Sequence, residues 1–405
     1  MDKEKIKMIC EKCKFICNAI RFQQNFKNWT SDNNDIDKLI QDTQLSIHKS
    51  AYGSLEWIPY DRFYDIKYIA KGGFGKVYKA NWIDGPILVW DDKIEDWKRK
   101  DQNKFVALKS LNNSTNITLE FINEIASHYK LSYTSDYAKN GSLRNYLDTN
   151  YNKLRWYDKI YCLQNIATGL VHIHNNEIIH RDLHIGNILS YKNLAYITDM
   201  GLCKPADYKE NTKNEVFGVL PYIAPEVLRG QDYTKGSDIY SFGIIMYEMV
   251  SGLPPYHDLS HDKSLAIKIC LGFRPRFNIK VPQLIVHLIK RCLDANPSNR
   301  PTAFEIFKIL DQWKGESRDL FELNQTELQK QINEADEINK KLSTSNVPST
   351  SLGLSYKPHS EAIYASRLLD FNDLPEPKNS DDYYEHHDNI TSMEYSESQQ
   401  INISQ

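Results

Sequence analysis

The stretch "IIHRDLHIGNIL" at residues 178–189 is followed by "ITDMGL" at residues 197–202. Together they place Asp182, then Asn187 five positions later, then Asp199 after a short predicted strand. An aspartate of this kind can act as a general base, and the other two side chains offer oxygen ligands that suit hard cations. Salt-bridged loop carboxylates would explain one of these positions but not the ordered set.

The segment before this stretch has the alternation of a small antiparallel sheet. "YDIKYIAKGGFGKVYKANW" runs from Tyr64, and "FVALKSL" follows a polar insertion at 81–104. The glycines at 72–75 would mark only a tight turn if taken alone. Lys109 on the later strand could reach phosphates held beneath that turn, although most strand lysines are solvated.

The segment after residue 139 has the pattern of helices. In residues 157–174 the apolar side chains recur at three- and four-residue spacing, which predicts a core-facing helix. A second apolar helix is predicted at 238–251, and helical patterns continue to about Trp313. The second half of the folded region is therefore predicted to be mainly helical.

Three further motifs follow in order: "PYIAPEVL" with Glu226, "SDIYSFG" with Asp238 and "NPSNRPT" with Arg300. With these motifs the chain resembles a eukaryotic protein kinase of the tyrosine-kinase-like group over about residues 61–313. It is especially similar to the kinase family expanded in arbuscular mycorrhizal fungi, whose members share leaders like "RFQQNFKNWTS" and tails like "LPEPKNSDDYYE".

The resemblance implies an α+β, two-lobed protein-kinase fold. The small lobe, about 61–138, would be an antiparallel sheet plus one helix, and the large lobe, about 139–313, would be mainly α-helical. The implied function is transfer of the γ-phosphate of ATP, with Mg²⁺, to protein Ser/Thr hydroxyls in intracellular signalling. Tyrosine stays open as an acceptor.

The same resemblance assigns the site residues. Catalysis would use Asp182 as the acceptor of the substrate's proton, with Lys109, Glu124 and Arg181; Lys109 would hold the α- and β-phosphates and pair with Glu124. The cofactor would contact Gly72, Gly73, Gly75, Val77, Ala107, Lys109 and Leu189, and the metal would be held by Asn187 and Asp199.

Supporting roles are implied as well. Arg181 beside the base implies control by phosphorylation of the activation segment, because a guanidinium there favours an anion. Tyr208 and Thr212 are candidate acceptors, or ordinary loop residues. Glu226 and Arg300 should form a buried ion pair, and Asp238 should hold the catalytic loop from below.

Four positions depart from the family pattern. Ala70 stands where the first glycine is common, and Met200 replaces a Phe but can fill the same apolar slot. His184 stands where serine/threonine kinases have a lysine, and Val219 where they have a threonine. Neither of the last two has the usual tyrosine-kinase identity, so group resemblance alone favours serine/threonine.

The bridge at 125–140 is short. The family has two strands and a hinge there, and these residues cannot complete a helix and two strands. Either the written sequence lacks an exon, or the chain is a truncated paralogue that acts as a pseudokinase or scaffold binding module. Both explanations stay open.

The flanks are predicted separately. The leader, 1–60, contains "CEKCKFIC"; Cys10, Cys13 and Cys17 lack a second cysteine pair, so zinc binding competes with a helical or disordered leader that happens to contain cysteines. Residues 314–342 predict an amphipathic helix. Residues 343–405 predict a disordered acidic tail, with 10 acids and 3 bases after residue 350. The 316–342 helix or the tail could bind a partner.

Composition sets limits on location and partners. The formal net charge of −3 gives no general basic surface, so nucleic acid is not an expected partner. The opening residues lack an apolar core of signal-peptide length, and no apolar run has the ~20 residues that span a bilayer. Seven scattered cysteines fit reduced thiols. A cytoplasmic location, with the nucleus also open, is expected.

Overall fold

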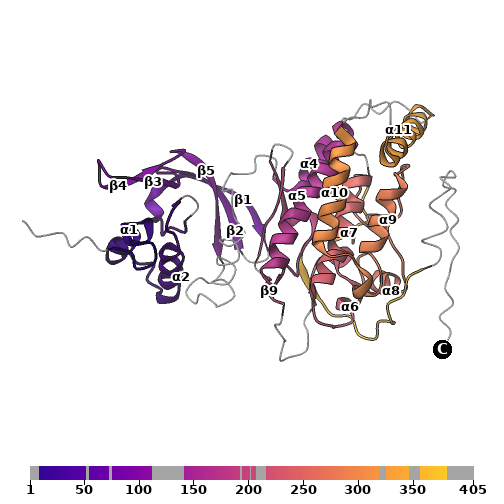
Figure 1. The fold of residues 1–405 in the computed structure, drawn as a ribbon. Helices are drawn as coiled ribbons and strands as arrows, with labels where there is room; N and C mark the ends of the chain where they lie inside the picture. The colour runs from indigo at the N-terminus through magenta and orange to yellow at the C-terminus, as the bar shows by residue number, and fades with distance from the viewer. Residues whose placement is uncertain are drawn as a thin grey trace, which may run out of the picture.

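The computed structural model describes a sheet-containing small lobe and a helical large lobe joined in one chain (Figure 1). The residues it describes are 9–51, 54–72, 75–111, 141–191, 194–200, 202–206, 216–318, 325–345 and 356–380. Glu124 and the short bridge at 125–140 lie outside them, so the predicted loss of strands is not addressed by the described part of the chain.

The small lobe is built on a three-stranded antiparallel sheet of order β1-β2-β5. Its strands are β1 (Phe63–Gly72), β2 (Gly75–Trp82) and β5 (Lys104–Leu111). Val77 lies opposite Lys109 in the register, and Ala107 is two residues before Lys109 on the same strand. Because successive strand residues face opposite sides, these three share one face of the sheet.

The polar insertion folds as a hairpin of β3 (Ile87–Asp91) and β4 (Asp96–Arg99). Trp90 and Trp97 face each other across it, with ring centroids 5.1 Å apart in an edge-to-face arrangement. This cross-strand aromatic pair explains why a segment that reads as polar forms strands.

The leader contains two helices, α1 (Asn18–Asn25) and α2 (Asn34–Leu45), which pack on each other, and α1 lies beside the hairpin (Figure 1). Phe22 of α1 stacks on Trp97 with centroids 4.5 Å apart, and Arg99 forms an ion pair with Glu56 at 2.7 Å. The alternative of a disordered leader is therefore wrong for the described residues 9–51. Aromatic and aliphatic side chains of the leader are buried against the insertion.

The large lobe holds most of the core. Its helices are α4 (Leu143–Asn150), α5 (Trp156–Asn175), α6 (Pro225–Leu228), α7 (Lys235–Ser251), α8 (Lys263–Cys270), α9 (Gln283–Cys292), α10 (Ala303–Arg318) and α11 (Glu327–Ser345). The predicted helices at 157–174 and 238–251 are confirmed by α5 and α7. Helix α7 is buried on nearly all sides, which explains its continuous apolar sequence.

Short strands connect these helices in antiparallel pairs. The pairs are β6 (Ile178–Ile179) with β9 (Lys204–Pro205), β7 (Ile188–Tyr191) with β8 (Leu194–Ile197), and β10 (Val216–Gly218) with β11 (Arg367–Leu369). Single 3-10 turns occur at Phe26–Asn28, Tyr60–Arg62, Tyr151–Lys153, Ile185–Asn187, Leu220–Tyr222 and Pro297–Asn299.

The amphipathic helix predicted at 314–342 is displaced. Helix α10 runs through Arg318, and α11 is a separate helix that begins at Glu327. Leu328, Ile332 and Ala335 on α11 are buried in the core of the large lobe. The apolar face of this helix is thus already covered by its own chain.

The prediction of a disordered tail is wrong for residues 356–380, which lie along the large lobe beside α8 (Figure 1, yellow). Leu369 and Leu374 are buried in the large-lobe core, and Phe371 packs against it. Averaging charge over the whole tail concealed this short apolar motif. The remaining parts of the tail, 346–355 and 381–405, lie outside the described residues.

Candidate active site

The loop that carries Asp182 is anchored from below by Asp238. One carboxylate oxygen of Asp238 accepts the His180 main-chain N–H at 2.8 Å, and the other accepts that of Arg181 at 3.0 Å. His174 also contacts this carboxylate at 3.0 Å. Asp238 is 2% exposed, so these partners offset the cost of burying it. The predicted anchoring role of Asp238 is confirmed.

Asp182 is itself buried, at 6% exposure, with its carboxylate facing several donors. Asn187 Nδ2 donates to the main-chain oxygen of Asp182 at 2.9 Å and lies 3.3 Å from its Oδ2. Burial opposes ionisation of this carboxyl, but hydrogen bonding and charge from His184, with help from Ser366, outweigh it and hold the Asp182 pKa below its usual value.

His184 occupies a fixed position next to Asp182. The Gly186 N–H donates to His184 Nδ1 at 3.2 Å, so in the neutral ring the proton sits on Nε2. Nε2 lies 3.7 Å from Asp182 Oδ2. A Cβ on Gly186 would lie 2.7 Å from Cε1 of the ring, so a glycine here allows the histidine this position.

Asp199 follows the β7–β8 hairpin and faces the small lobe. Its Oδ1 accepts a hydrogen bond from Lys109 Nζ at 3.0 Å, with both side chains about one-third exposed. Thr198 fixes the hairpin end to the loop, because its N–H donates to the Asn187 carbonyl at 2.8 Å. Asp199 has φ 58°, a left-handed conformation that is costly for an aspartate and common at functional sites.

The predicted cofactor-contacting residues of the sheet lie around Lys109. Val77 and Ala107 share its face, as the register requires. Gly72 and Gly75 are the paired ends of β1 and β2 at the glycine turn, while Gly73 lies outside the described residues. From the large lobe, Leu189 on β7 is half-buried and forms a bridge with Ser142.

The remaining predicted residues divide into placed and undescribed ones. The Arg181 guanidinium lies 4.5 Å from the centre of the Tyr233 ring, and Arg181 has φ 70°. Met200 is 2% exposed within the core, as its apolar replacement role requires. Glu124, Tyr208 and Thr212 lie outside the described residues.

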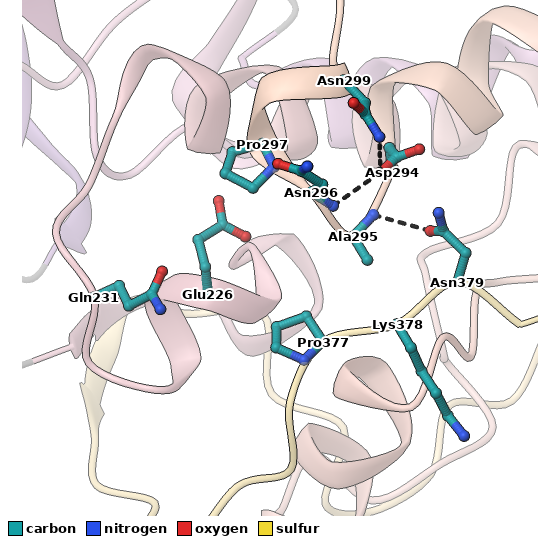
Figure 2. A pocket seen from close by; sticks show the side chains of 10 residues that line it. All are labelled: Glu226, Gln231, Asp294, Ala295, Asn296, Pro297, Asn299, Pro377, Lys378 and Asn379. Atoms are coloured by element: carbon teal, nitrogen blue, oxygen red, sulfur yellow. Dashed lines mark hydrogen bonds between the residues drawn. The ribbon is translucent and has the colours of Figure 1, made fainter.

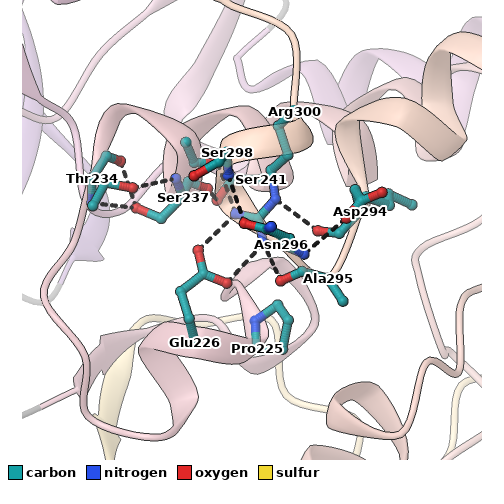
Figure 3. A network of polar contacts seen from close by, with 12 residues as sticks. Pro225, Glu226, Thr234, Ser237, Ser241, Asp294, Ala295, Asn296, Ser298 and Arg300 are labelled. Carbon is teal, nitrogen blue, oxygen red and sulfur yellow. Dashed lines mark hydrogen bonds and ion pairs between the residues drawn. The ribbon is translucent and has the colours of Figure 1, made fainter. Parts of the chain in front are cut away.

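Glu226 and Arg300 form the predicted ion pair, which is thereby confirmed (Figure 3). The guanidinium is bidentate, with Nη1 to Oε1 at 2.6 Å and Nη2 to Oε2 at 2.7 Å. Arg300 also donates to the carbonyls of Gly236 and Asp294. The pair links α6 to the first turn of α7 and to the segment that precedes α10.

A pocket of about 360 Å³ adjoins this pair on the surface (Figure 2). Its lining combines Glu226, Gln231 and the turn at 294–299 with Pro377, Lys378 and Asn379 of the tail. None of the predicted catalytic, cofactor or metal residues lines it. It is a consequence of the tail crossing the lobe and is separate from the Asp182 loop.

Two features of the site escaped the sequence reasoning. Arg144 donates to the fully buried Glu248 at 2.6 Å, and Tyr222 donates to the other oxygen of that carboxylate. Ser366, in the tail, donates its hydroxyl to Asp182 Oδ2 at 2.6 Å. The apolar residues after Ser366 could have indicated that this part of the tail packs on the large lobe. Its contact with Asp182 depends on the completed fold.

The fold has a sheet-containing lobe and a helical lobe, and Lys109 of the sheet contacts Asp199 next to the loop of the buried Asp182. This arrangement is that of a protein kinase domain. The protein tyrosine and serine/threonine kinase family matches residues 65–310, more than half of the chain. The chain belongs to this family.

Curated relatives agree in class. The chain is 32% identical over 275 residues to serine/threonine-protein kinase VIK of Arabidopsis thaliana, covering 62% of this chain and 60% of the relative. It is 27% identical over 270 residues to probable serine/threonine-protein kinase kinX of Dictyostelium discoideum, covering 63% of this chain and 24% of the relative. Putative serine/threonine-protein kinase/receptor R818 of Acanthamoeba polyphaga mimivirus is 29% identical over 284 residues, covering 68% of this chain and 17% of the relative. The chain thus spans less than two thirds of each of these relatives.

Proposed function

We propose that this chain transfers the γ-phosphate of ATP to serine or threonine hydroxyls of proteins. The observation that carries the proposal is the Lys109–Asp199 contact at 3.0 Å, which joins the two lobes beside the loop of Asp182. A phosphoryl donor needs cationic contacts and a metal, and its acceptor needs a base. Lys109, Asp199 and Asp182 supply these groups within one site.

Family membership implies ATP and a divalent metal, and we propose Mg²⁺ as that metal. The carboxylate of Asp199 and the amide oxygen of Asn187 are hard oxygen donors, which fit Mg²⁺ better than softer metals. When bound, the ion would neutralise charge on the phosphates. Asp182, Arg181, Glu124 and the glycine-turn residues keep their proposed roles on the strength of the resemblance.

The finer classification is also a proposal. We place the chain in the tyrosine-kinase-like group, near the family expanded in arbuscular mycorrhizal fungi, on its motifs and on the leader and tail sequences. The names of the curated relatives favour serine/threonine over tyrosine as acceptor. Domain limits of 61–313, with the leader before and helix and tail after, follow from the same reading.

Location and partners rest on composition. We propose a cytoplasmic protein, with access to the nucleus, that acts on proteins without nucleic acid or membrane binding. Within the described residues no helix combines the length and hydropathy of a bilayer span. The exposed face of α11 and the acidic tail stay candidate partner surfaces.

Radiolabelled phosphate transfer from ATP and Mg²⁺ to a generic protein substrate tests the proposal. We expect transfer by the full chain and its loss in Asp182→Asn. Asp232→Asn is the matched control, because Asp232 is an exposed aspartate of the same lobe, and it should retain transfer. ATP binding without transfer by a folded wild-type chain would instead support the pseudokinase alternative.

A further inference from the structure

The tail at 356–380 is held to the large lobe by contacts along its whole length. The His359 N–H donates to the His257 carbonyl at 2.7 Å, and Tyr364 OH donates to the Pro255 carbonyl at 2.9 Å. Further along, the Lys378 N–H donates to the Cys270 carbonyl at 2.9 Å. Together with buried Leu369 and Leu374, these contacts fix the path of the segment.

Ser366 lies at the point where this path meets the catalytic loop. Its Oγ is 2.8 Å from Oδ1 and 2.6 Å from Oδ2 of Asp182, and 3.4 Å from His184 Nε2. The carboxylate is 6% exposed, so the serine hydroxyl reaches a base that solvent hardly touches. A hydroxyl within hydrogen-bond reach of a base satisfies the geometric condition for proton transfer.

The residues after Ser366 are held as a peptide strand. Arg367, Leu368 and Leu369 pair antiparallel with Gly218, Phe217 and Val216 of β10. Arg367 also donates to the His261 carbonyl at 2.6 Å. Addition of a strand to an exposed edge is a recurrent way to bind peptides, in which main-chain bonds give affinity and side-chain pockets give specificity.

Gly218 makes the close approach feasible. It has φ +152°, and a Cβ there would lie 2.6 Å from Ile223 and 3.4 Å from Asp182 Oδ1. A larger residue would push β10, and with it the paired tail, away from the base. The strand and the loop are thus fitted to each other at the position of Ser366.

We infer that the tail is a tethered substrate of the kinase site and that Ser366 is its phosphoacceptor. This inference rests on the proposed function and names a substrate for it. In the step, Ser366 Oγ bonds to the γ-phosphorus of ATP, the bond from that phosphorus to the β–γ bridging oxygen breaks, and ADP leaves with the electron pair. Asp182 takes the hydroxyl proton.

Phosphorylation of Ser366 should release the tail from the catalytic loop. After the step Asp182 loses the hydroxyl proton to solvent, and a phosphoserine with close to two negative charges at neutral pH would then face its carboxylate. Like charges at this distance repel strongly in a site of low dielectric. We use the term substrate groove for the edge of β10 (Val216–Gly218) beside Asp182, which the tail covers. The unphosphorylated tail blocks this groove to other peptides, and its own phosphorylation opens it.

The test is incubation of the full chain with ATP and Mg²⁺, followed by mass spectrometry of Ser366 and by measurement of transfer to an added serine peptide. We expect phosphate on Ser366 at a rate constant that is unchanged over about a hundredfold dilution, because a tethered reaction is intramolecular. A lag in peptide transfer should accompany it. Leu369→Asp, which undocks the strand, should abolish the lag.

Two matched variants complete the design. Ser366→Ala should keep the groove blocked and show slow peptide transfer, whereas Ser360→Ala, an exposed serine of the same segment, should behave as wild type. Transfer to the peptide with no phosphate on Ser366, or a rate that rises with protein concentration, would overturn the inference alone. Absence of transfer to either acceptor, from wild type and from Leu369→Asp, would overturn the proposed function too.

An independent observation concerns the leader. The ligand atoms of Cys10, Cys13, Cys17 and His48 all lie within 4.8 Å of one another. His48 Nδ1 is 3.5 Å from Cys10 Sγ and 3.3 Å from Cys17 Sγ. The cysteines lack a second cysteine pair, but His48 supplies a fourth potential ligand, because the helices α1 and α2 return the chain to the cysteine turn.

The cysteine turn has the form of a metal-binding knuckle. The Cys10 N–H donates to the Phe15 carbonyl at 3.0 Å, and the Lys14 N–H, at φ 62°, donates to the Cys10 carbonyl at 2.8 Å. The main-chain amides of Lys12 and Cys13 face the Cys10 sulfur. Thiolates, not thiols, bind metals.

We propose that these four residues form a structural zinc site. Three thiolates and one imidazole complete a tetrahedral shell without an open position, as structural zinc requires. The ion would join the turn before α1 to the segment after α2. Since Phe22 of α1 stacks on Trp97, the zinc-bound leader would brace the hairpin of the small lobe.

Zinc content of the full chain, purified under reducing conditions and incubated with zinc, tests this proposal. We expect one tightly bound ion per chain, and a cobalt-substituted form with the absorption of a tetrahedral thiolate site. His48→Asn should weaken zinc binding more than about 100-fold, while His48→Cys should keep it. Cys203→Ser, a cysteine outside the cluster, is the control. No tight zinc in the wild type, or equal affinity in His48→Asn, would overturn the site.

Discussion

At the scale of single residues, His184 shows how a departure from the family pattern can be accommodated. Its ring is fixed by the Gly186 N–H, and Nε2 faces both Asp182 and Ser366. An N–H donor at this position would stabilise the negative charge that develops next to the acceptor hydroxyl.

We therefore expect His184→Gln to lower kcat for peptide phosphorylation by about 100-fold with little change in the KM for ATP. His184→Lys should restore most of the rate, because an ammonium can reach the same carboxylate. Steady-state kinetics measure both. His172→Gln, an exposed histidine of α5, serves as the control. Near-normal kcat in His184→Gln would show that the ring only fills space.

Lys159 on α5 presents a different residue-scale question, because its ammonium is buried in the core of the large lobe. Nζ donates to the Val250 carbonyl at 3.1 Å and lies 4.1 Å from the centre of the Tyr151 ring. Burial lowers the Lys159 pKa to about 7, against a smaller opposing effect of Asp336. Since the usual lysine pKa is about 10.4, the unfolded chain binds this proton more tightly.

The sign of the pH effect follows. The cost of Lys159 is fully present below pH 7 and is relieved as pH rises towards 10. Lys159→Met should raise the free energy of unfolding by about 1–3 kcal/mol at neutral pH, and the gain should shrink at higher pH. Urea titrations at both ends of this range measure it, with exposed Lys308→Met as control. A gain that grows with pH would contradict the assignment.

At the scale of elements, the Glu226–Arg300 pair tests how the large lobe is braced. Arg300 is 7% and Glu226 3% exposed, so removal of one partner leaves the other as a buried charge without its ion pair. Arg300→Met should cost about 3–5 kcal/mol of unfolding free energy, and the double change with Glu226→Met should cost less. Chemical denaturation measures both. Arg155→Met instead breaks a pair with Asp158 in which the arginine is 76% exposed, and it should cost less than about 1 kcal/mol.

Elements also show what the sequence could supply. Helices α5 and α7 followed from apolar spacing, and the ordered motifs led to the loop held by Asp238, because each of these signals is local. The β3–β4 hairpin was missed, since its Trp90–Trp97 pair is a cross-strand contact. The boundary between α10 and α11 was misplaced at residue 314, because a polar interruption in a helical pattern carries little information.

At the scale of the whole molecule, the missed features are those made by distant parts of the chain. His48 is 31 residues from Cys17, and Ser366 is 184 residues from Asp182. No periodicity or spacing encodes such meetings, which depend on the completed fold. The tail was predicted to be disordered for the same reason, because its few apolar residues stabilise an ordered conformation only when they pack on the large lobe.

In the whole chain, the tail should stabilise the large lobe and at the same time restrict the access of peptides to the substrate site. A chain ending at Ser345 lacks the tail and so loses the buried Leu369 and Leu374 from the large-lobe core. Removing two such side chains should cost about 3–6 kcal/mol and lower the melting temperature. The same chain should phosphorylate an added peptide without a lag.

A chain ending at Ser380 is the matched control, because it keeps every described contact of the tail. It should match the full chain in melting temperature and in lag. Calorimetry and peptide phosphorylation measure the two properties on the same samples. If removal of residues 346–405 left both properties unchanged, the tail would not occupy the groove in solution. A fall in melting temperature without faster peptide transfer would mean that the segment stabilises the lobe without blocking its substrate site.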